Sequence, residues 1–267
     1  MANKIEKQFL DTENKGPVRL NKYLSEAGVC SRREADKLIA AGQVTVDGVR
    51  AETGMKVEPW QVVRIGKKQV SRQEEMIVLA VNKPRGIVCT EERRERDSIV
   101  RFLNYPVRIT YVGRLDKDTE GLLLITDDGM LAHELLAPGK HVDKTYFVRV
   151  EGKLTVENIR NLENGVDIGE EKLTMPAKVE IVGGSWEGAG GMQPGRVRIQ
   201  NLPEVYTELH LTIHEGKFHQ VKRMMAAVGN PVIYLKRISM GPLTLPDNLK
   251  KGECRPLTEE ELLRLKG

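Results

Sequence analysis

The apolar positions near the start of the chain recur first with helical spacing and then with strand spacing. The stretch "VRLNKYLSEAG" predicts a short helix that ends at Gly28. The stretch "SRREADKLIAAG" predicts a second helix, because Ser31 and Glu34 have the spacing of a capping box. In "QVTVDGVRAETGMKV", alternation around Asp47 and Gly48 predicts a β-hairpin. We therefore expect a small module of two helices and a hairpin.

The rest of the chain has the pattern of many short strands and fewer helices. The continuous apolar runs "MIVLAV" and "LLLIT" predict buried strands, and the alternating runs "TYFVRVEG", "AKVEIVGG", "RVRIQNL" and "ELHLTIHEG" predict half-buried ones. Helical spacing is found in "TVENIRNLENG" and "HQVKRMMAAVG". The glycine-rich stretch 185–206 predicts a protruding loop or irregular hairpin. This mixture predicts an α+β domain with a mixed, largely antiparallel sheet flanked by helices.

The two patterns are separated by the charged stretch "RIGKKQVSRQEE". A chain of 267 residues is long enough for one small domain and one large domain. We expect the first domain over residues 18–66, a linker over residues 67–75 and the second domain over residues 76–262.

The positive charge of the chain is concentrated in the first domain. The net charge is only +4, but residues 18–72 contain eleven Lys and Arg against six Asp and Glu. Such a local excess favours binding to a polyanion, and an ordinary solvated surface is the alternative. The basic face that we expect consists of Arg19, Lys22, Arg32, Arg33 and Lys37.

Membrane and metal signals are weak in this sequence. No apolar run approaches the roughly 18 to 20 residues of a membrane-spanning helix, and residues 1–17 lack the apolar core of a signal peptide. We therefore expect a cytoplasmic protein without membrane contact. Cys30, Cys89 and Cys254 have neither zinc-site nor disulfide-framework spacing, so we expect reduced, buried thiols and no metal site.

The stretch "GRLDKDTEGLLLITDDG", residues 113–129, places several charges directly before a buried strand. One interpretation is a calcium loop, because "DKDTEG" has the acidic spacing of an EF-hand. However, its twelfth position is Asp127 where a bidentate Glu is required, and strand-like runs flank it in place of helices. A second interpretation is a surface loop with an ion pair between Asp116 and Arg114. A catalytic site is the third.

The first module resembles a known RNA-binding module. The stretch "VRLNKYLSEAGVCSRREADKLIAAGQVTVDG" is similar to the alpha-L motif, which is named after a small-subunit ribosomal protein. The helix pair, the "SRREAD" cap and the "VTVDG" hairpin occur together and in the same order. The resemblance implies binding to structured RNA through shape and phosphate contacts.

The second domain resembles the pseudouridine synthases that modify ribosomal RNA. The similarity is carried by "GRLDKDTEGLLLITDDG" and continues through "NKPRGIVCT", "KTYFVRV" and "EGKFHQVKRMMAAVGNP". It implies conversion of a uridine into pseudouridine without a cofactor, because nothing is oxidised. The last motif and "GECRPLTEEEL" most resemble the branch that acts on small-subunit RNA. The implied partner is ribosomal RNA, free or in a partly assembled particle, and we expect a monomer.

Two alternatives within this resemblance stay open. Relatives that act on large-subunit ribosomal RNA share the catalytic motifs, so the target subunit is the weaker part of the assignment. A non-catalytic RNA-binding protein that retains the fold is the other alternative.

The resemblance assigns three catalytic residues. Asp116 matches the family's catalytic aspartate, which acts beside the sugar as a nucleophile or assists proton removal. Lys222 of "HQVKR" matches the basic residue that holds this carboxylate ionised, where many relatives have Arg. Tyr146 of "KTY" matches the tyrosine that stacks on the base and takes the proton from C5. Asp118 is the rival carboxylate, and we interpret it as a loop or capping acid.

Further residues are expected around the RNA. Arg114 matches the family residue that fills the space left by the flipped target base. Arg223 lies one residue beyond Lys222 and is expected to meet a phosphate, while Leu211 or Ile213 offers an apolar wall for the base. We interpret His219 as structural. The residues that we expect along the RNA path are Lys83 and Arg85.

Overall fold

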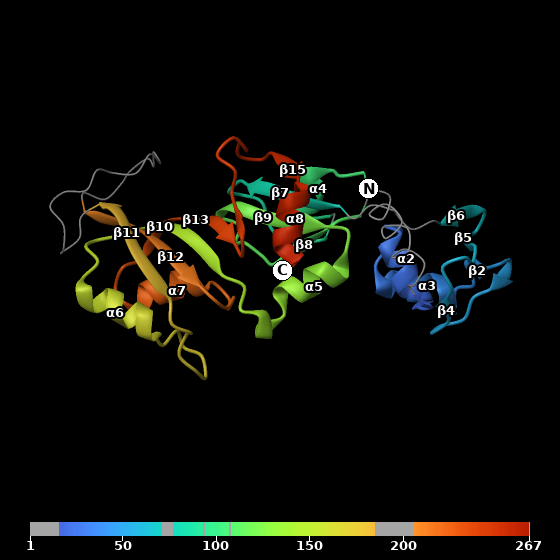
Figure 1. Ribbon diagram of the computed structural model, residues 1–267, viewed down its shortest axis with the longest axis horizontal. Coiled ribbons are helices and arrows are strands. Elements are labelled where there is room, and N and C mark those ends of the chain that lie inside the picture. The colour runs from blue at the N-terminus through green and yellow to red at the C-terminus, as the bar shows by residue number, and fades with distance from the viewer. Residues whose placement is uncertain (1–15, 71–76, 93, 107, 185–204, 267) are drawn as a thin grey trace, which may run out of the picture. The chain divides into compact units, whose positions relative to one another are not determined.

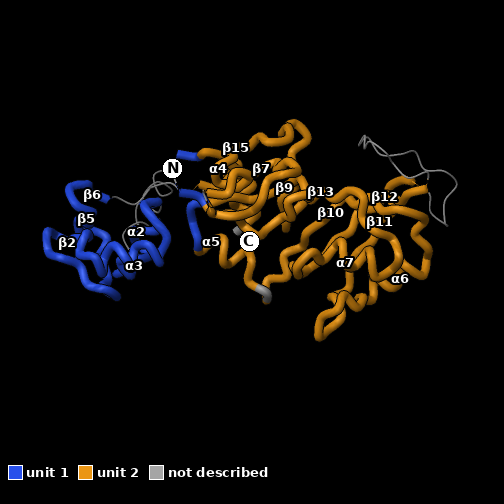
Figure 2. The backbone as a smooth tube through the Cα atoms, turned by 180° about the vertical axis from the view of Figure 1, so that it is seen from behind, with its two compact units in different colours: residues 1–76, 105–109, 127–129 blue, residues 77–104, 110–126, 130–267 orange. Residues whose placement is uncertain are grey.

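The computed structural model describes two compact units (Figure 2). The described residues are 16–70, 77–92, 94–106, 108–184 and 205–266. The first unit comprises residues 1–76, 105–109 and 127–129, and the second comprises residues 77–104, 110–126 and 130–267. The expected glycine-rich loop lies almost wholly outside the described residues, as does the predicted strand "RVRIQNL".

The first unit contains the predicted helix pair, α2 (Leu20–Glu26) and α3 (Arg32–Ala40). The predicted capping box is confirmed, because the Glu34 N–H donates to Ser31 Oγ at 3.1 Å and the Ser31 N–H donates to Glu34 Oε2 at 2.7 Å. The inner faces of both helices carry the core of this unit, where Leu24 is fully buried. Its strands are β1 (Val18–Arg19), β2 (Val44–Val46), β3 (Val49–Arg50), β4 (Lys56–Val57), β5 (Val63–Ile65) and β6 (Lys68–Val70).

The predicted hairpin joins β2 to β3 in a sheet with the order β3-β2-β5-β6. Its turn residues Asp47 and Gly48 have φ of 51° and 83°, the positive values that a type I′ turn requires. The sheet also extends past residue 66, the expected end of the first domain. Residues 68–70 form β6, which pairs with β5 and buries Val70, so part of the expected linker is an edge strand.

The second unit is built on one mixed sheet, as the α+β prediction required. Among the described residues the sheet has nine strands, with the path β11-β12-β10-β13-β9-β7-β15 and with β8 and β14 beside it. All of its pairs are antiparallel except β9 with β13. The strands are β7 (Val78–Lys83), β8 (Thr110–Val112), β9 (Glu120–Thr126), β10 (Lys144–Glu151), β11 (Lys178–Gly184), β12 (Tyr206–Ile213), β13 (Val232–Met240), β14 (Leu243–Thr244) and β15 (Cys254–Pro256).

Helices accompany both halves of this sheet. The predicted helices α6 and α7 lie side by side along the half formed by β10 to β13, and α4, α5 and α8 lie with the other half (Figure 1). No helix among the described residues is long and apolar enough to cross a membrane. The helices are α4 (Ile99–Leu103), α5 (Gly129–Leu136), α6 (Val156–Asn164), α7 (Gln220–Ala227) and α8 (Glu259–Lys266), with a 3-10 turn at Pro138–Lys140.

Strand β9 is the predicted "LLLIT" strand and lies at the centre of the sheet. Every residue of β9 is buried, and the strand has β7 on one side and β13 on the other. Gly121 has φ of +108°, and a Cβ atom there would lie 2.2 Å from the carbonyl oxygen of Arg237. Only glycine therefore allows β13 to approach this end of β9. The close approach fixes the point at which the charged loop before β9 leaves the sheet.

The cysteines only partly match the expectation of buried thiols. Cys89 is buried, Cys30 is half-buried and Cys254 is exposed. The prediction was wrong for Cys254 because this residue lies on β15, the edge strand of the sheet, where one side is open to solvent.

Candidate active site

The charged loop 113–119, between β8 and β9, is supported by the segment that follows β7. The Gly86 N–H donates to the carbonyl oxygen of Lys117 at 2.7 Å, and the Leu115 N–H donates to Cys89 Sγ at 3.4 Å. The motif "NKPRGIVC" therefore supports the loop of "GRLDKDTEG", although the two are separated in sequence. This contact gives the loop a fixed backbone, which a site for chemistry requires.

Lys83 holds the same loop from beneath. Its side chain is completely buried, and its ammonium donates to the carbonyl oxygens of Pro84 at 3.1 Å, Asp116 at 3.0 Å and Thr119 at 2.7 Å. Burial lowers the pKa of Lys83. The expectation that Lys83 lies along the RNA path is therefore corrected. Its ammonium lies inside the protein and binds backbone carbonyl oxygens of the loop.

Replacing Lys83 with Met should destabilise the protein and loosen the Asp116 loop. One buried and two partly buried carbonyl groups lose their donor, which we expect to lower the free energy of unfolding by about 3 kcal/mol. Urea denaturation measures this change. The exposed Lys178 is the control, and Lys178→Met should change stability by less than about 0.5 kcal/mol. Equal stability of the two variants would contradict this role of Lys83.

The carboxylate of Asp116 lies beside two basic side chains at the start of α7. Lys222 Nζ is 2.9 Å from Asp116 Oδ2, and His219 Nε2 is 3.4 Å from Asp116 Oδ1. Lys222 Nζ also contacts Asp118 Oδ1 at 2.6 Å. The side chain of Asp116 is 27% exposed, whereas that of Asp118 is 68% exposed. The structure thus brings the predicted pair Asp116 and Lys222 together, with Asp118 as a second, more solvated partner of the same ammonium.

Charge complementarity shifts the pKa values of Lys222 and Asp118. Burial alone lowers the pKa of Lys222, but its hydrogen bonds to Asp118 and Asp116 outweigh burial and raise that pKa above its usual range. Burial raises the pKa of Asp118, but the hydrogen bond and charge of Lys222 outweigh it and lower that pKa. An ammonium that stays protonated therefore faces both aspartates at neutral pH.

Arg223 points away from Lys222, as expected for the next residue on a helix. Its guanidinium contacts Glu170 Oε1 at 2.8 Å, the carbonyl oxygen of Phe218 at 3.1 Å and the carbonyl oxygen of Ile168. The expectation that Arg223 meets a phosphate does not agree with these contacts. The side chain is already engaged by the protein and fixes the residues that precede α7.

Tyr146 lies on β10 with an apolar neighbour on the same face. It is buried, and its register partner on β12 is Leu211, which is fully buried. Lys144, two residues before Tyr146, pairs with Ile213. Cross-strand partners have side chains on one face, so both apolar candidates lie on the Tyr146 side of the sheet and Leu211 is the directly opposite one. No hydrogen bond of the Tyr146 hydroxyl is found within the described part of the chain.

The remaining predicted RNA contacts are mostly exposed. Arg114 is exposed and has no hydrogen-bond or ion-pair partner among the described residues. Arg85 is exposed and lies over the ring of Tyr234, 4.8 Å from the centroid. In the first unit, Lys22 is half-buried and pairs with Glu26 at 3.5 Å. The other predicted basic residues of that unit are exposed: Arg19, Arg32, Arg33 and Lys37.

His219 is the residue of this site that the sequence interpretation missed. It was expected to be structural, but its imidazole lies beside the Asp116 carboxylate. Its φ of 48° places it in the left-handed region at the N-cap of α7, an uncommon conformation outside glycine. The spacing offered a signal, because positions three apart at the start of a helix face the same way, as His219 and Lys222 do.

The calcium interpretation does not agree with this geometry. The loop lies between strands β8 and β9, whereas an EF-hand loop lies between helices. Asp116 and Asp118 both face Lys222. Across the described ranges, no cluster of three or more His, Cys, Asp or Glu side chains is placed to hold a metal ion.

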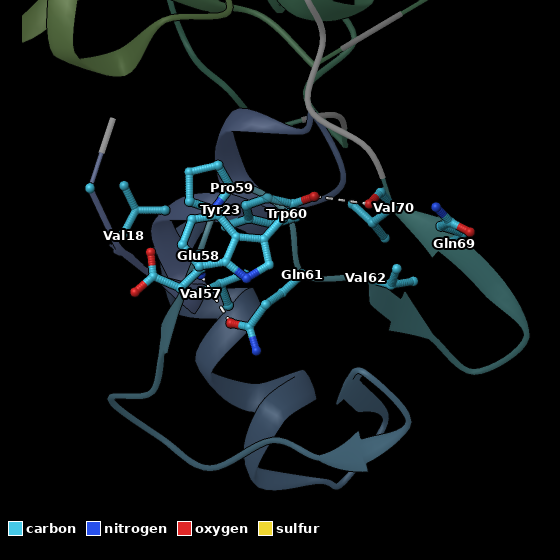
Figure 3. A pocket seen from close by; sticks show the side chains of 11 residues that line it. Val18, Tyr23, Val57, Glu58, Pro59, Trp60, Gln61, Val62, Gln69 and Val70 are labelled. Carbon is cyan, nitrogen blue, oxygen red and sulfur yellow. Dashed lines mark hydrogen bonds between the residues drawn. The ribbon is translucent and has the colours of Figure 1, made fainter. Parts of the chain in front are cut away.

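A separate hollow lies within the first unit (Figure 3). It has a volume of about 300 Å³ and is lined by Val18, Val57 and the exposed Trp60. The Tyr23 hydroxyl donates to the carbonyl oxygen of Val70 at 3.1 Å along its wall. The only carboxylate in its lining is Glu58, and no basic side chain lines it. This composition is unlike the Asp116 cluster and offers no acid–base pair for chemistry.

Comparisons with known proteins identify a family for each part of the chain. The family described as RNA pseudouridylate synthase matches residues 77–227, and the S4 domain family matches residues 18–73. The chain is 42% identical over 251 residues to the uncharacterized RNA pseudouridine synthase YtzG of Bacillus subtilis, covering 92% of this chain and 97% of that protein. It is 39% identical over 249 residues to the ribosomal small subunit pseudouridine synthase A of Yersinia pestis, covering 92% and 97%.

Two further comparisons extend the result. The dual-specificity RNA pseudouridine synthase RluF of Escherichia coli is 37% identical over 250 residues, covering 93% of this chain and 78% of that protein. A crystal structure described as a pseudouridylate synthase matches with a TM-score of 0.62 and 32% identity, covering 93% of this chain and 99% of that chain. Since the family match spans more than half of the chain and the relatives align along nearly all of it, this protein belongs to the RNA pseudouridylate synthase family and carries an S4 domain before the synthase domain.

Proposed function

We propose that this protein isomerises a uridine of small-subunit ribosomal RNA to pseudouridine at Asp116. The observation that supports the chemistry most directly is the carboxylate of Asp116 with Lys222 at 2.9 Å on a loop held by buried Lys83. The relatives named as ribosomal small subunit pseudouridine synthases support the target class. The reaction breaks the bond from N1 of uracil to the sugar, rotates the base and joins C5 to the same sugar carbon.

Each catalytic side chain has a distinct task in this proposal. Asp116 acts at the sugar as a nucleophile or assists proton removal, and Lys222 orients its carboxylate. Tyr146 stacks on the freed base and accepts the proton from C5. Leu211 supplies the apolar wall opposite Tyr146 on the neighbouring strand. Because bonds are exchanged without oxidation, the reaction needs no redox cofactor.

The target base has to leave its stack before it reaches Asp116. Flipping a base costs a few kcal/mol, and a side chain that occupies the vacated position offsets part of this cost. Arg114 precedes Asp116 by two residues and is exposed, which suits that task. We place the reaction in the cytoplasm, on free ribosomal RNA or a partly assembled particle, with the protein acting as a monomer.

The basic face of the first unit provides affinity through phosphate contacts. Removing two of its exposed cations with Arg32→Ala and Arg33→Ala should weaken RNA binding and lower the slope of log affinity against log salt by about 1 to 2 units. The salt titration of a fluorescent ribosomal RNA fragment measures both values. A matched change in the second unit, Arg264→Ala, should leave the slope unchanged. An unaltered slope in the double variant would contradict the role of this face.

The target subunit is decided by mapping pseudouridine across both ribosomal RNAs in a strain that lacks this protein. Loss of one small-subunit site is the expected result, and loss of a large-subunit site would support the alternative target. If no site is lost, a non-catalytic RNA-binding role is supported instead. Incubation of the purified protein with ribosomal RNA and excess chelator then tests the reaction directly, and product should form.

A further inference from the structure

An exposed aromatic ring stands next to the Asp116 cluster. Phe218 is 69% exposed, whereas apolar residues of this size are usually buried. Its ring stacks on His219, with the centroids 3.8 Å apart and the planes inclined by 18°. His219 in turn contacts Asp116 at 3.4 Å. One face of the Phe218 ring is thus covered by His219, and its large exposed fraction leaves the other face open beside the catalytic loop.

The backbone that carries this ring is held in place by several side chains. Gln220 is buried, and its Oε1 accepts from the Lys217 N–H at 2.9 Å while its Nε2 donates to Glu215 at 2.8 Å. Arg223 donates to the carbonyl oxygen of Phe218 at 3.1 Å. These contacts pre-organise the segment before α7, so the ring is presented on a rigid support and does not need to be ordered when a ligand arrives.

We propose that the open face of Phe218 stacks on the nucleobase adjacent to the flipped uridine, so that Phe218 and His219 extend the RNA stack toward Asp116. When the target base leaves the helix or loop, each neighbouring base loses one stacking partner; Arg114 covers one of the two exposed faces, and the other is left for Phe218. An exposed aromatic side chain beside cationic groups is the usual protein partner for such a face. This role rests on the proposed function and assigns a contact to a nucleotide that does not react.

The chemistry around the ring favours a nucleobase over a protein partner. Phe218 is flanked in sequence by Lys217 and His219, and Lys222 lies one turn away on α7. Lys217 pairs with Glu215 at 3.6 Å and Lys222 pairs with Asp116 and Asp118, so the aromatic ring, and not these cations, makes the proposed contact. Base–aromatic stacking tolerates any base, so the contact strengthens binding and positions the RNA without selecting a sequence.

Fluorescence can detect the stack directly. The RNA is a fragment that carries the uridine mapped above, with each neighbour replaced in turn by 2-aminopurine, whose emission is quenched when it stacks on an aromatic ring. We expect quenching at one neighbouring position with the unchanged protein and its loss with Phe218→Leu, while Phe218→Trp retains it. Quenching that persists with Phe218→Leu, or that occurs at neither neighbour, would overturn the proposal.

Kinetics separate this contact from the chemistry. Phe218→Leu should raise KM about tenfold, the loss expected for one base–aromatic stack, with kcat within about twofold. The matched control is Phe102→Leu, which alters another exposed Phe on α4 and should leave both constants unchanged. If the unchanged protein forms pseudouridine and Phe218→Leu has the same KM, only the stacking role is rejected. If no RNA yields product, the proposed function and this inference both fail.

Discussion

Replacing Asp116 with Asn should abolish pseudouridine formation and leave RNA affinity within about twofold of the unchanged protein. The substitution keeps the size of the side chain but removes its charge and its nucleophilic oxygen, so a loss in kcat of about 10³-fold or more is expected. The loop backbone should stay in place, because Lys83 binds the carbonyl oxygen of Asp116 and not its side chain. Single-turnover product formation and fluorescence anisotropy measure the two quantities separately.

Asp118→Asn is the internal control for this prediction. Both aspartates contact Lys222, so each variant removes one of the two carboxylate charges that face the same ammonium. Asp118 is far more exposed than Asp116, and after its replacement the ion pair between Lys222 and Asp116 remains. We expect Asp118→Asn to retain most activity. An active Asp116→Asn variant, or equal losses for the two variants, would show that the wrong carboxylate has been assigned.

Local sequence patterns predicted much of the fold because local forces decide those elements. The capping box of Ser31 and Glu34 starts α3 as predicted, since both hydrogen bonds join residues three apart. The apolar run before Thr126 forms the buried central strand β9, since continuous hydrophobicity suits a strand covered on both faces. The hydrophobic pattern did not predict the pairing of β9 with β13. This pairing depends on the close approach between Gly121 and Arg237, which lies far along the chain.

The errors at the site have a common physical cause. Lys83 was expected along the RNA path, and Arg223 was expected to meet a phosphate because it is the residue after Lys222. In the structure, backbone carbonyl groups of distant segments accept hydrogen bonds from both side chains, and sequence spacing does not report such long-range partners. The pairing of Asp116 with Lys222 was predicted through the family resemblance. The hydrophobic periodicity alone predicted that Asp116 lies on a loop and Lys222 on a helix, but it did not predict that the two side chains are in contact.

Replacing Lys222 with Met should reduce kcat about 10²-fold or more, because the cation that orients Asp116 is lost. The same change leaves two neighbouring carboxylates without their shared ammonium, and their repulsion should displace Asp116 from its productive position. Lys222→Arg retains the charge and should keep a substantial part of the activity. Initial rates under saturating RNA give kcat, and anisotropy should show that affinity changes much less than the rate.

A second substitution separates charge compensation from direct catalysis by Lys222. If the main effect of Lys222→Met is the uncompensated charge beside Asp116, adding Asp118→Asn removes one of the two repelling groups and should restore part of the lost rate. The double-mutant cycle then gives a non-additive effect, as expected for residues in one ionic cluster. Additive losses would instead indicate that Lys222 contacts the RNA or the reacting base independently of the aspartates, and that the 2.9 Å ion pair is not its catalytic task.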